Sequence, residues 1–143
     1  KDYSVTSRCL VLKDNQYAEL FEEDWEFEYV YAPSLKNLIE DQFRNTNVKM
    51  VFMPTLESAD DCAFYDVPLE KADFPNLKLI RRGVFTSISS IQVNLPRLTQ
   101  MVDTYQFQAC DNLEVFIALQ LEEIGEACFQ LCCKLKTVIT PKA

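Results

Sequence analysis

The six cysteines have the widest chemical repertoire in this sequence, because a thiol can bind metal, form a disulfide or act as a nucleophile. Cys128, Cys132 and Cys133 lie close together and suggest a zinc site. No histidine or second cysteine pair completes four ligands, so we expect no metal. Cys110 and Cys132 occupy equivalent repeat positions, where a disulfide is geometrically allowed. The other cysteines show no framework spacing, so the pattern favours free thiols that pack like small apolar side chains.

The densest charge feature is an acidic run that extends from Glu22 to Glu28 and contains Trp25. A calcium-binding EF-hand loop would need carboxylates at a fixed spacing around a central glycine, and neither is present. The run is expected either to be a solvated acidic face or to recognise a basic segment of a partner, with Trp25 as an anchor. No pair of carboxylates is set apart for glycosidase-like acid–base work.

Histidine is absent from the sequence. This absence excludes Ser-His-Asp and Cys-His catalysis, imidazole ligation of a metal and a histidine switch near neutral pH. The phosphate-binding loop, the dinucleotide-binding glycine motif, the nucleophile elbow and the zinc-protease motif are also missing. We therefore expect no enzymatic activity and no cofactor.

Charge and composition narrow the class of partner. The net charge is −8, and no basic cluster is available to bind phosphates, so neither nucleic acid nor an anionic membrane surface is expected to bind. No apolar stretch is long enough for a transmembrane helix, and no signal peptide is visible. A protein partner, including one with basic patches, fits this charge best.

An internal repeat determines the elements that position these side chains. Phenylalanine recurs every 21 or 22 residues, at Phe21, Phe43, Phe64, Phe85, Phe107 and Phe129. Five of the six prolines keep the same phase, namely Pro33, Pro54, Pro75, Pro96 and Pro141. A period of about 20 to 50 residues is typical of a solenoid, in which each unit buries its apolar face against its neighbours.

Each unit combines a strand with a turn. The short alternating run before each proline predicts a half-buried strand, which ends at proline because proline has no N–H for the ladder. Stacked units would place these strands side by side in a parallel sheet. Residues 121–135 alone would also fit an amphipathic helix. A helical bundle, however, would not explain why proline returns on the same phase.

The last unit is the clearest and resembles the BspA-type leucine-rich repeat. It reads Leu121-x-x-Ile124-Gly125-x-x-x-Phe129-x-x-Cys132-x-x-Leu135-x-x-Val138-x-Thr140-Pro141. The resemblance covers about residues 33–143 and weakens toward the N-terminus, where the units around Phe43, Phe64 and Phe85 lack the cysteine and Gly83 is displaced. Members of this family are mostly surface proteins that bind other proteins or host molecules.

The resemblance implies a leucine-rich-repeat solenoid. This fold is a right-handed superhelix with a parallel β-sheet on the concave side and short turns or helical arcs on the convex side. Residues 1–32 would form a degenerate N-terminal repeat or cap, and residues 33–143 an array of about five repeats. The array is read as a fragment of a longer one.

The repeat also assigns a face to each strand residue. Residues one, three and six before the proline are expected to face the core, and those two and four before it to face the concave surface. The expected inward residues are Val51, Met53, Ala72, Phe74, Val93, Leu95, Phe116, Ala118, Val138 and Thr140. The expected outward residues, which are the candidate binding residues, are Tyr29, Tyr31, Met50, Phe52, Lys71, Asp73, Gln92, Asn94, Val115, Ile117, Thr137 and Ile139.

The outward residues differ along the array. Its N-terminal end carries Tyr29, Tyr31, Met50 and Phe52, side-chain types that are enriched in interface hot spots. This cluster is interpreted either as a binding patch or as core that the N-terminal residues cover as a cap. The next pair, Lys71 and Asp73, favours a solvated charge pair over a ligand site.

Two functions follow from this pattern. The resemblance implies a non-catalytic interaction module that binds a protein partner through the concave strand face. The alternative is a structural subunit or spacer within a larger assembly. Self-association through the C-terminal end is expected in that case, because the array stops at Ala143 without a polar cap. Cysteine usage and the absence of a glycosylation sequon indicate a cytoplasmic location, whereas the family resemblance implies the cell surface.

Overall fold

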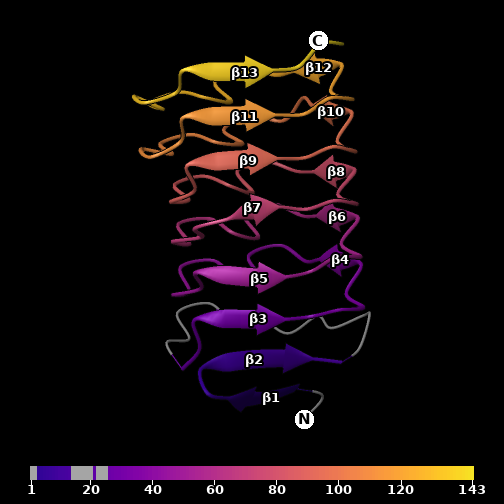
Figure 1. The fold of residues 1–143 in the computed structure, drawn as a ribbon, viewed down its shortest axis with the longest axis vertical. Helices are drawn as coiled ribbons and strands as arrows, with labels where there is room; N and C mark the ends of the chain where they lie inside the picture. The colour runs from indigo at the N-terminus through magenta and orange to yellow at the C-terminus, as the bar shows by residue number, and fades with distance from the viewer. Residues whose placement is uncertain (1–2, 14–20, 22–25) are drawn as a thin grey trace.

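The computed structural model of this chain describes residues 3–13, 21 and 26–143. Its regular structure in these residues consists of thirteen short strands, with no helix. The chain winds into coils that stack along one long axis, with the termini at opposite ends (Figure 1). This arrangement confirms the solenoid predicted from the repeat and rules out a helical bundle.

The strands are distributed over two faces. The strand face contains the hairpin strands β1 (Tyr3–Thr6) and β2 (Cys9–Leu12) and the strands that precede the proline positions: β3 (Tyr29–Tyr31), β5 (Met50–Phe52), β7 (Ala72–Asp73), β9 (Gln92–Asn94), β11 (Val115–Ile117) and β13 (Thr137–Ile139). The second face contains β4 (Asn37–Leu38), β6 (Ser58–Ala59), β8 (Leu79–Ile80), β10 (Gln100–Met101) and β12 (Glu123–Ile124). The β1–β2 pair is an antiparallel hairpin, and all other paired strands of the described residues are parallel.

The strand face is divided into two sheets, where the sequence predicted one. The first has the order β1-β2-β3-β5 and the second the order β13-β11-β9-β7. No Cα atom of β5 lies within 8 Å of a Cα atom of β7. Paired strands are only about 4.8 Å apart. Figure 1 shows the division as the wider separation of the β5 and β7 arrows.

The segments that connect the two faces are turns, and the helical arcs suggested as one form of the convex side do not occur in the described residues. Left-handed residues interrupt each arc; examples are Cys62 with Asp66 and Ala127 with Leu131. A residue in this conformation cannot continue a right-handed helix. The arc N–H groups bond to the next coil instead: Phe43 donates to Ala63 at 2.9 Å. The hydrogen bonds of the arcs therefore stabilise the stack.

The recurring phenylalanines form the centre of the core. Their rings stack in one column, with centroid separations of 5.4 Å for Phe21–Phe43, 5.7 Å for Phe43–Phe64, 5.8 Å for Phe64–Phe85, 5.2 Å for Phe85–Phe107 and 5.8 Å for Phe107–Phe129. All except Phe129 are buried. Each coil thus contributes one ring to a column that connects it to its neighbours, as a solenoid requires.

Burial alternates along the strands as a period of two demands. Met53 and Ala72 are buried, whereas the adjacent Phe52 and Asp73 are exposed. The last coil departs from the prediction, because Val138 is 43% exposed. Thr140 in the same coil is half-buried. Val138 belongs to β13, and Thr140 directly follows it. Among the described residues, no further coil covers that strand.

Candidate functional site

All the predicted outward residues lie on the strand face. Lys71 directly precedes β7, and the other residues belong to β3, β5, β7, β9, β11 and β13. Asn94, Val115 and Ile117 are half-buried, and the rest are exposed. Their role in binding stays a prediction.

The hairpin strand β2 extends this face by one coil. Cys9 and Val11 of β2 lie in register with Tyr29 and Tyr31 of β3, and both are half-buried. The alternation of Leu10 and Leu12 was the signal for this strand in the sequence. Because β2 pairs with one edge of β3, the hairpin adds β2 and β1 to this end of the sheet. Most of the acidic run, including Trp25, lies outside the described residues.

Four large side chains form a continuous apolar surface on β3 and β5, which we call the aromatic patch. Their exposed fractions are 40% for Tyr29, 46% for Tyr31, 42% for Met50 and 51% for Phe52. Tyr31 and Phe52 stack with ring centroids 5.4 Å apart and planes 8° apart. Residues of the two strands are paired directly, Tyr29 with Met50 and Tyr31 with Phe52. The strand register therefore places all four on the same side of the sheet.

A groove follows the aromatic patch where the sheet is divided. Its volume is about 290 Å³, and it is lined by Met50, Val51, Phe52, Met53, Pro54, Lys71, Asp73 and Pro75. Val51 faces inward, yet it is half-buried, whereas the equivalent Val30 and Ala72 are buried. The division of the sheet therefore gives solvent access to a residue that the repeat pattern assigns to the core.

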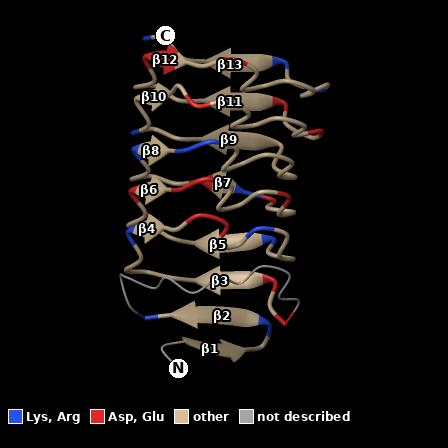
Figure 2. Ribbon diagram, turned by 180° about the vertical axis from the view of Figure 1, so that it is seen from behind, with Lys and Arg blue, Asp and Glu red and all other residues tan. Residues whose placement is uncertain are grey.

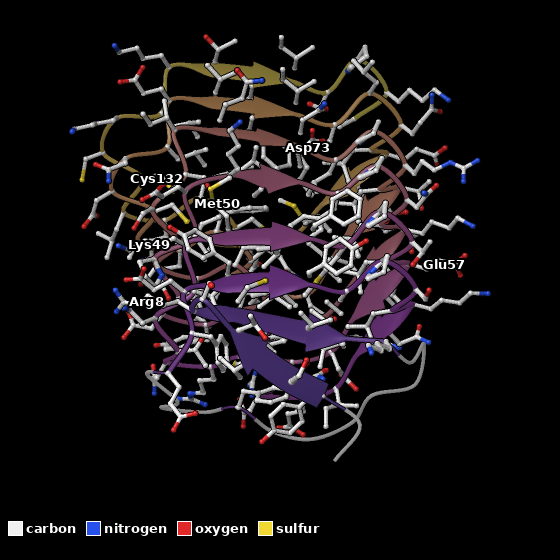
Figure 3. The ribbon with its side chains drawn as sticks, turned by 60° about the horizontal axis from the view of Figure 1, so that its bottom comes forward. Arg8, Lys49, Met50, Glu57, Asp73 and Cys132 are labelled. Carbon is white, nitrogen blue, oxygen red and sulfur yellow. The ribbon has the colours of Figure 1, made fainter. Side chains whose placement is uncertain are left out.

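Charged side chains border the patch and the groove. At the start of the strands, Glu28 is within 3.6 Å of Arg8 and 3.3 Å of Lys49, so this member of the acidic run is paired within the chain. Figure 3 shows Arg8 and Lys49 at this border and Met50 and Asp73 on the strands. In the groove, Lys71 and Asp73 form no ion pair with any described residue. Their charges are available to a ligand.

The opposite face of the solenoid is different in character. Acidic and basic segments follow one another there, with Asp60 and Asp61 after β6 and Arg81 and Arg82 after β8 (Figure 2). The backbone N–H of Arg82 donates to the Asp61 carboxylate at 3.1 Å. Leu79 is an exposed apolar residue on this face, 41% accessible. The second face therefore offers charge where the strand face offers aromatic surface.

The thiols differ in acidity. All six cysteines are free. A hydrogen bond between Cys110 and Cys132 in neighbouring coils, together with burial, raises the pKa of Cys110. The same hydrogen bond lowers the pKa of Cys132 to about 7. Burial raises the pKa of Cys62 and of Cys128. Cys132 is thus the more acidic thiol of the pair.

Metal-ligating clusters and membrane-spanning helices are absent from the described residues. No group of three or more cysteine, aspartate or glutamate side chains among them is arranged to hold a metal ion. Within the same residues, no helix has the length and apolar character needed to span a membrane.

Comparison with known families explains the repeat. The BspA type leucine rich repeat region matches residues 17–143 in six copies. The chain belongs to the BspA-type leucine-rich repeat family. A comparison with curated proteins and with solved structures gave no match. The first copy in this BspA-type chain begins at residue 17, within the segment for which the sequence predicted a degenerate repeat or cap. Membership indicates an interaction or structural repeat module of a generally non-catalytic fold.

Proposed function

We propose that this BspA-type array is a non-catalytic interaction module that binds a protein partner through its strand face. The aromatic patch is the anchor of the interaction. The observation that supports this function is that Tyr29, Tyr31, Met50 and Phe52 form one continuous surface and are each at least 40% exposed. Exposed apolar patches bordered by polar residues typically mark contact surfaces.

The patch has the physical properties of an interface centre. Tyrosine and phenylalanine contribute a large contact area and lose few rotatable bonds on binding, and tyrosine is enriched in hot spots. The backbone beneath them is held by the parallel register with neighbouring coils. A partner would therefore pay little entropy for ordering this surface, which favours affinity.

Charge indicates the chemistry of the partner. The whole chain carries a net charge of −8. Glu26 precedes the patch in sequence, Glu70 and Asp73 lie on the coil next to it, and all three are exposed. The complementary surface would be an apolar protrusion surrounded by lysine or arginine residues, because opposite potentials accelerate association and exclude wrong partners. A basic protein surface therefore fits better than an acidic one.

The test compares two faces of the same molecule. Tyr31→Ala combined with Phe52→Ala removes the centre of the patch, and Leu79→Ala removes an exposed apolar side chain from the second face as a matched control. Bound proteins captured from extracts by the wild-type chain are identified, and their affinities are then measured by calorimetry. We expect the double variant to weaken binding at least 30-fold, equivalent to about 2 kcal/mol for a hot spot, and the control variant to bind as wild type.

Three results would contradict the proposal. Equal weakening by Leu79→Ala would show that the strand face is not the binding surface. A fall in thermal stability of the double variant that matches its loss of binding would show a structural role for the two rings. Self-association that the double variant abolishes, measured by sedimentation, would show instead that the patch pairs with a second copy of this chain.

A further inference from the structure

The division between β5 and β7 leaves two strand edges facing each other without a partner. At three paired boundaries of the strand face, a backbone N–H directly after one strand donates to the next: Ala32 to Phe52 at 2.9 Å, Leu95 to Ile117 at 2.9 Å and Ala118 to Ile139 at 3.0 Å. Among the described residues, the paired β7–β9 boundary lacks this bond. Met53 occupies the equivalent position in the β5 coil. Among the described residues, its N–H makes no such bond.

The backbone groups that face the division follow from the parallel ladder. Both the N–H and the C=O of a residue in a parallel strand point to the same side, and successive residues alternate. The N–H of Met50 donates to Glu28 at 3.5 Å, and the C=O of Phe52 accepts from Ala32, so both residues bond toward β3. The N–H and C=O of Val51 therefore point toward β7.

The opposite edge is assigned in the same way. The N–H of Val115 donates to Ile91 at 3.2 Å, and Leu95 donates to Ile117, so the odd-numbered residues around β9 bond toward β11. Gln92 and Asn94 therefore bond toward β7. The residue of β7 whose backbone groups face them is Ala72, which is paired with Val93. This leaves the backbone groups of Lys71 and Asp73 directed toward β5.

The opening is limited at both ends. Before it, the N–H of Glu70 donates to Lys49 at 2.8 Å. After it, the side-chain amide of Asn76 donates to the C=O of Pro54 at 2.6 Å. The opening therefore spans residues 50–53 on one edge, which corresponds to roughly 13 Å of extended chain. It has the length of a short extended segment.

We propose that this opening takes up an extended peptide segment of a partner as an additional parallel strand between β5 and β7. The proposal rests on the function proposed above, because it concerns the same face. A strand inserted between two others requires a separation of about 9.6 Å, twice the usual spacing. The two edges are already more than 8 Å apart. Unpaired strand edges are templates for added strands, whose main-chain hydrogen bonds provide affinity.

Side chains along the opening specify the sequence of the segment. Its inward residue would lie between Val51 and Ala72 in a groove of about 290 Å³, which favours a small apolar side chain such as valine. Its first outward residue would lie beside Lys71, and its second beside Asp73 and the ring of Phe52. An acidic residue suits the first position. An arginine suits the second, because it can pair with the carboxylate and pack against the ring.

The decisive measurement is amide hydrogen exchange of the intact chain in the presence of the capped synthetic peptide acetyl-Glu-Val-Arg-amide, whose three residues fit the length of the opening. At a peptide concentration ten times its Kd, only about one molecule in eleven is free to exchange. The amides of Val51 and Asp73 should therefore exchange about tenfold more slowly. The amide of Ala32, already bonded to Phe52, is the internal control and should not change.

Two pairs of variants test the same geometry by affinity. Val51→Pro removes the N–H that faces the opening, and Val51→Ala keeps it; the first should weaken peptide binding at least tenfold and the second less than threefold. The peptide with the order Arg-Val-Glu should bind about tenfold more weakly than Glu-Val-Arg. Lys71→Glu combined with Asp73→Lys should reverse this preference.

The outcomes separate this proposal from the proposed function. Failure of the peptide to bind at millimolar concentration, equal affinity for both peptide orders, or binding without slower exchange at Val51 would overturn strand insertion. Each of these results leaves docking on the aromatic patch intact, because that proposal is tested with Tyr31→Ala and Phe52→Ala. If Val51→Pro does not fold, the exchange measurement on the wild-type chain decides.

Discussion

The column of stacked phenylalanines offers the sharpest test of what holds the coils together. Phe64 is fully buried, and its ring centroid lies 5.7 Å from that of Phe43 and 5.8 Å from that of Phe85. A third ring, Phe74, lies 5.8 Å away in a tilted orientation. We predict that Phe64→Ala lowers the free energy of unfolding by about 4 kcal/mol, the middle of the range for buried phenylalanine truncations.

Two contributions make up this value. Removing the buried side chain from the core forfeits about 2–3 kcal/mol of transfer free energy. Each of the two stacked contacts with Phe43 and Phe85 adds about 0.5–1 kcal/mol. A domain of this length is stable by about 5–15 kcal/mol, so the loss is a large share of the total. It corresponds to a fall in the melting temperature of about 8–16 °C.

Phe52→Ala provides a matched control. It removes the same atoms from a ring that is 51% exposed and contacts Tyr31 at the surface. We expect this control to change the free energy of unfolding by less than about 1 kcal/mol, as is usual for surface substitutions. Urea denaturation followed by circular dichroism gives both values. If Phe64→Ala costs no more than Phe52→Ala, the ring column is not the principal support of the stack.

Two further predictions concern the thiols and the glycines. Because the hydrogen bond with Cys110 lowers the pKa of Cys132 to about 7, Cys132 should be alkylated by iodoacetamide near neutral pH faster than Cys110, with a rate that falls about tenfold per pH unit below the pKa. Mass spectrometry reads the alkylated site, and a pH profile unchanged by Cys110→Ala would contradict this assignment. Gly125→Ala places a Cβ 2.8 Å from the carbonyl carbon of Val102 and should cost about 2 kcal/mol. Gly83→Ala meets nothing closer than 3.4 Å but has a φ of +64°, so it should cost about 1 kcal/mol; thermal denaturation in the opposite order would refute this ranking.

The stacking of coils could be predicted from the sequence because burial imposes a period on side chains. A ring that must pack on its equivalents in adjacent coils recurs at one spacing, so Phe43 and Phe64 mark the same core position. The alternation of Met53 with Phe52 likewise follows from the two-residue period of a strand. The ion pair between Glu28 and Lys49 could also be predicted from the sequence, because the two residues are 21 positions apart, one repeat length.

The shape of the arcs could not be predicted in the same way. Left-handed backbone is expected at glycine, asparagine or aspartate. Asp41 and Asn45 follow that expectation, but Ala127 and Leu131 adopt the same conformation without a side chain that favours it. In the last unit, the helical pattern of apolar residues and the turn pattern coincide. The hydrogen bonds between neighbouring coils, which no local sequence window contains, determine the turn.

The division of the strand face was hidden for a related reason. Whether β5 bonds to β7 depends on backbone groups, whereas the inward and outward pattern of the side chains is the same in both cases. The one unusual feature nearby is Pro68, next to a tight turn in which Leu69 donates to Val67 at 2.7 Å. That turn precedes a strand of only two residues, β7. The outward residues could be named from the sequence, but the groove between them could not.

The solenoid can lose these ladder bonds on the strand face because other bonds connect the same two coils. Across this boundary, β4 pairs with β6, the arc N–H of Phe43 donates to Ala63, and the rings of Phe43 and Phe64 stack. The coils therefore remain in register while one edge of their contact stays open. Between these two coils, structural support lies in the core, the arc and the β4–β6 pair, and the unpaired backbone is on the strand face. A partner that fills the opening would restore the missing ladder, so its binding should stabilise the fold as well as occupy the site.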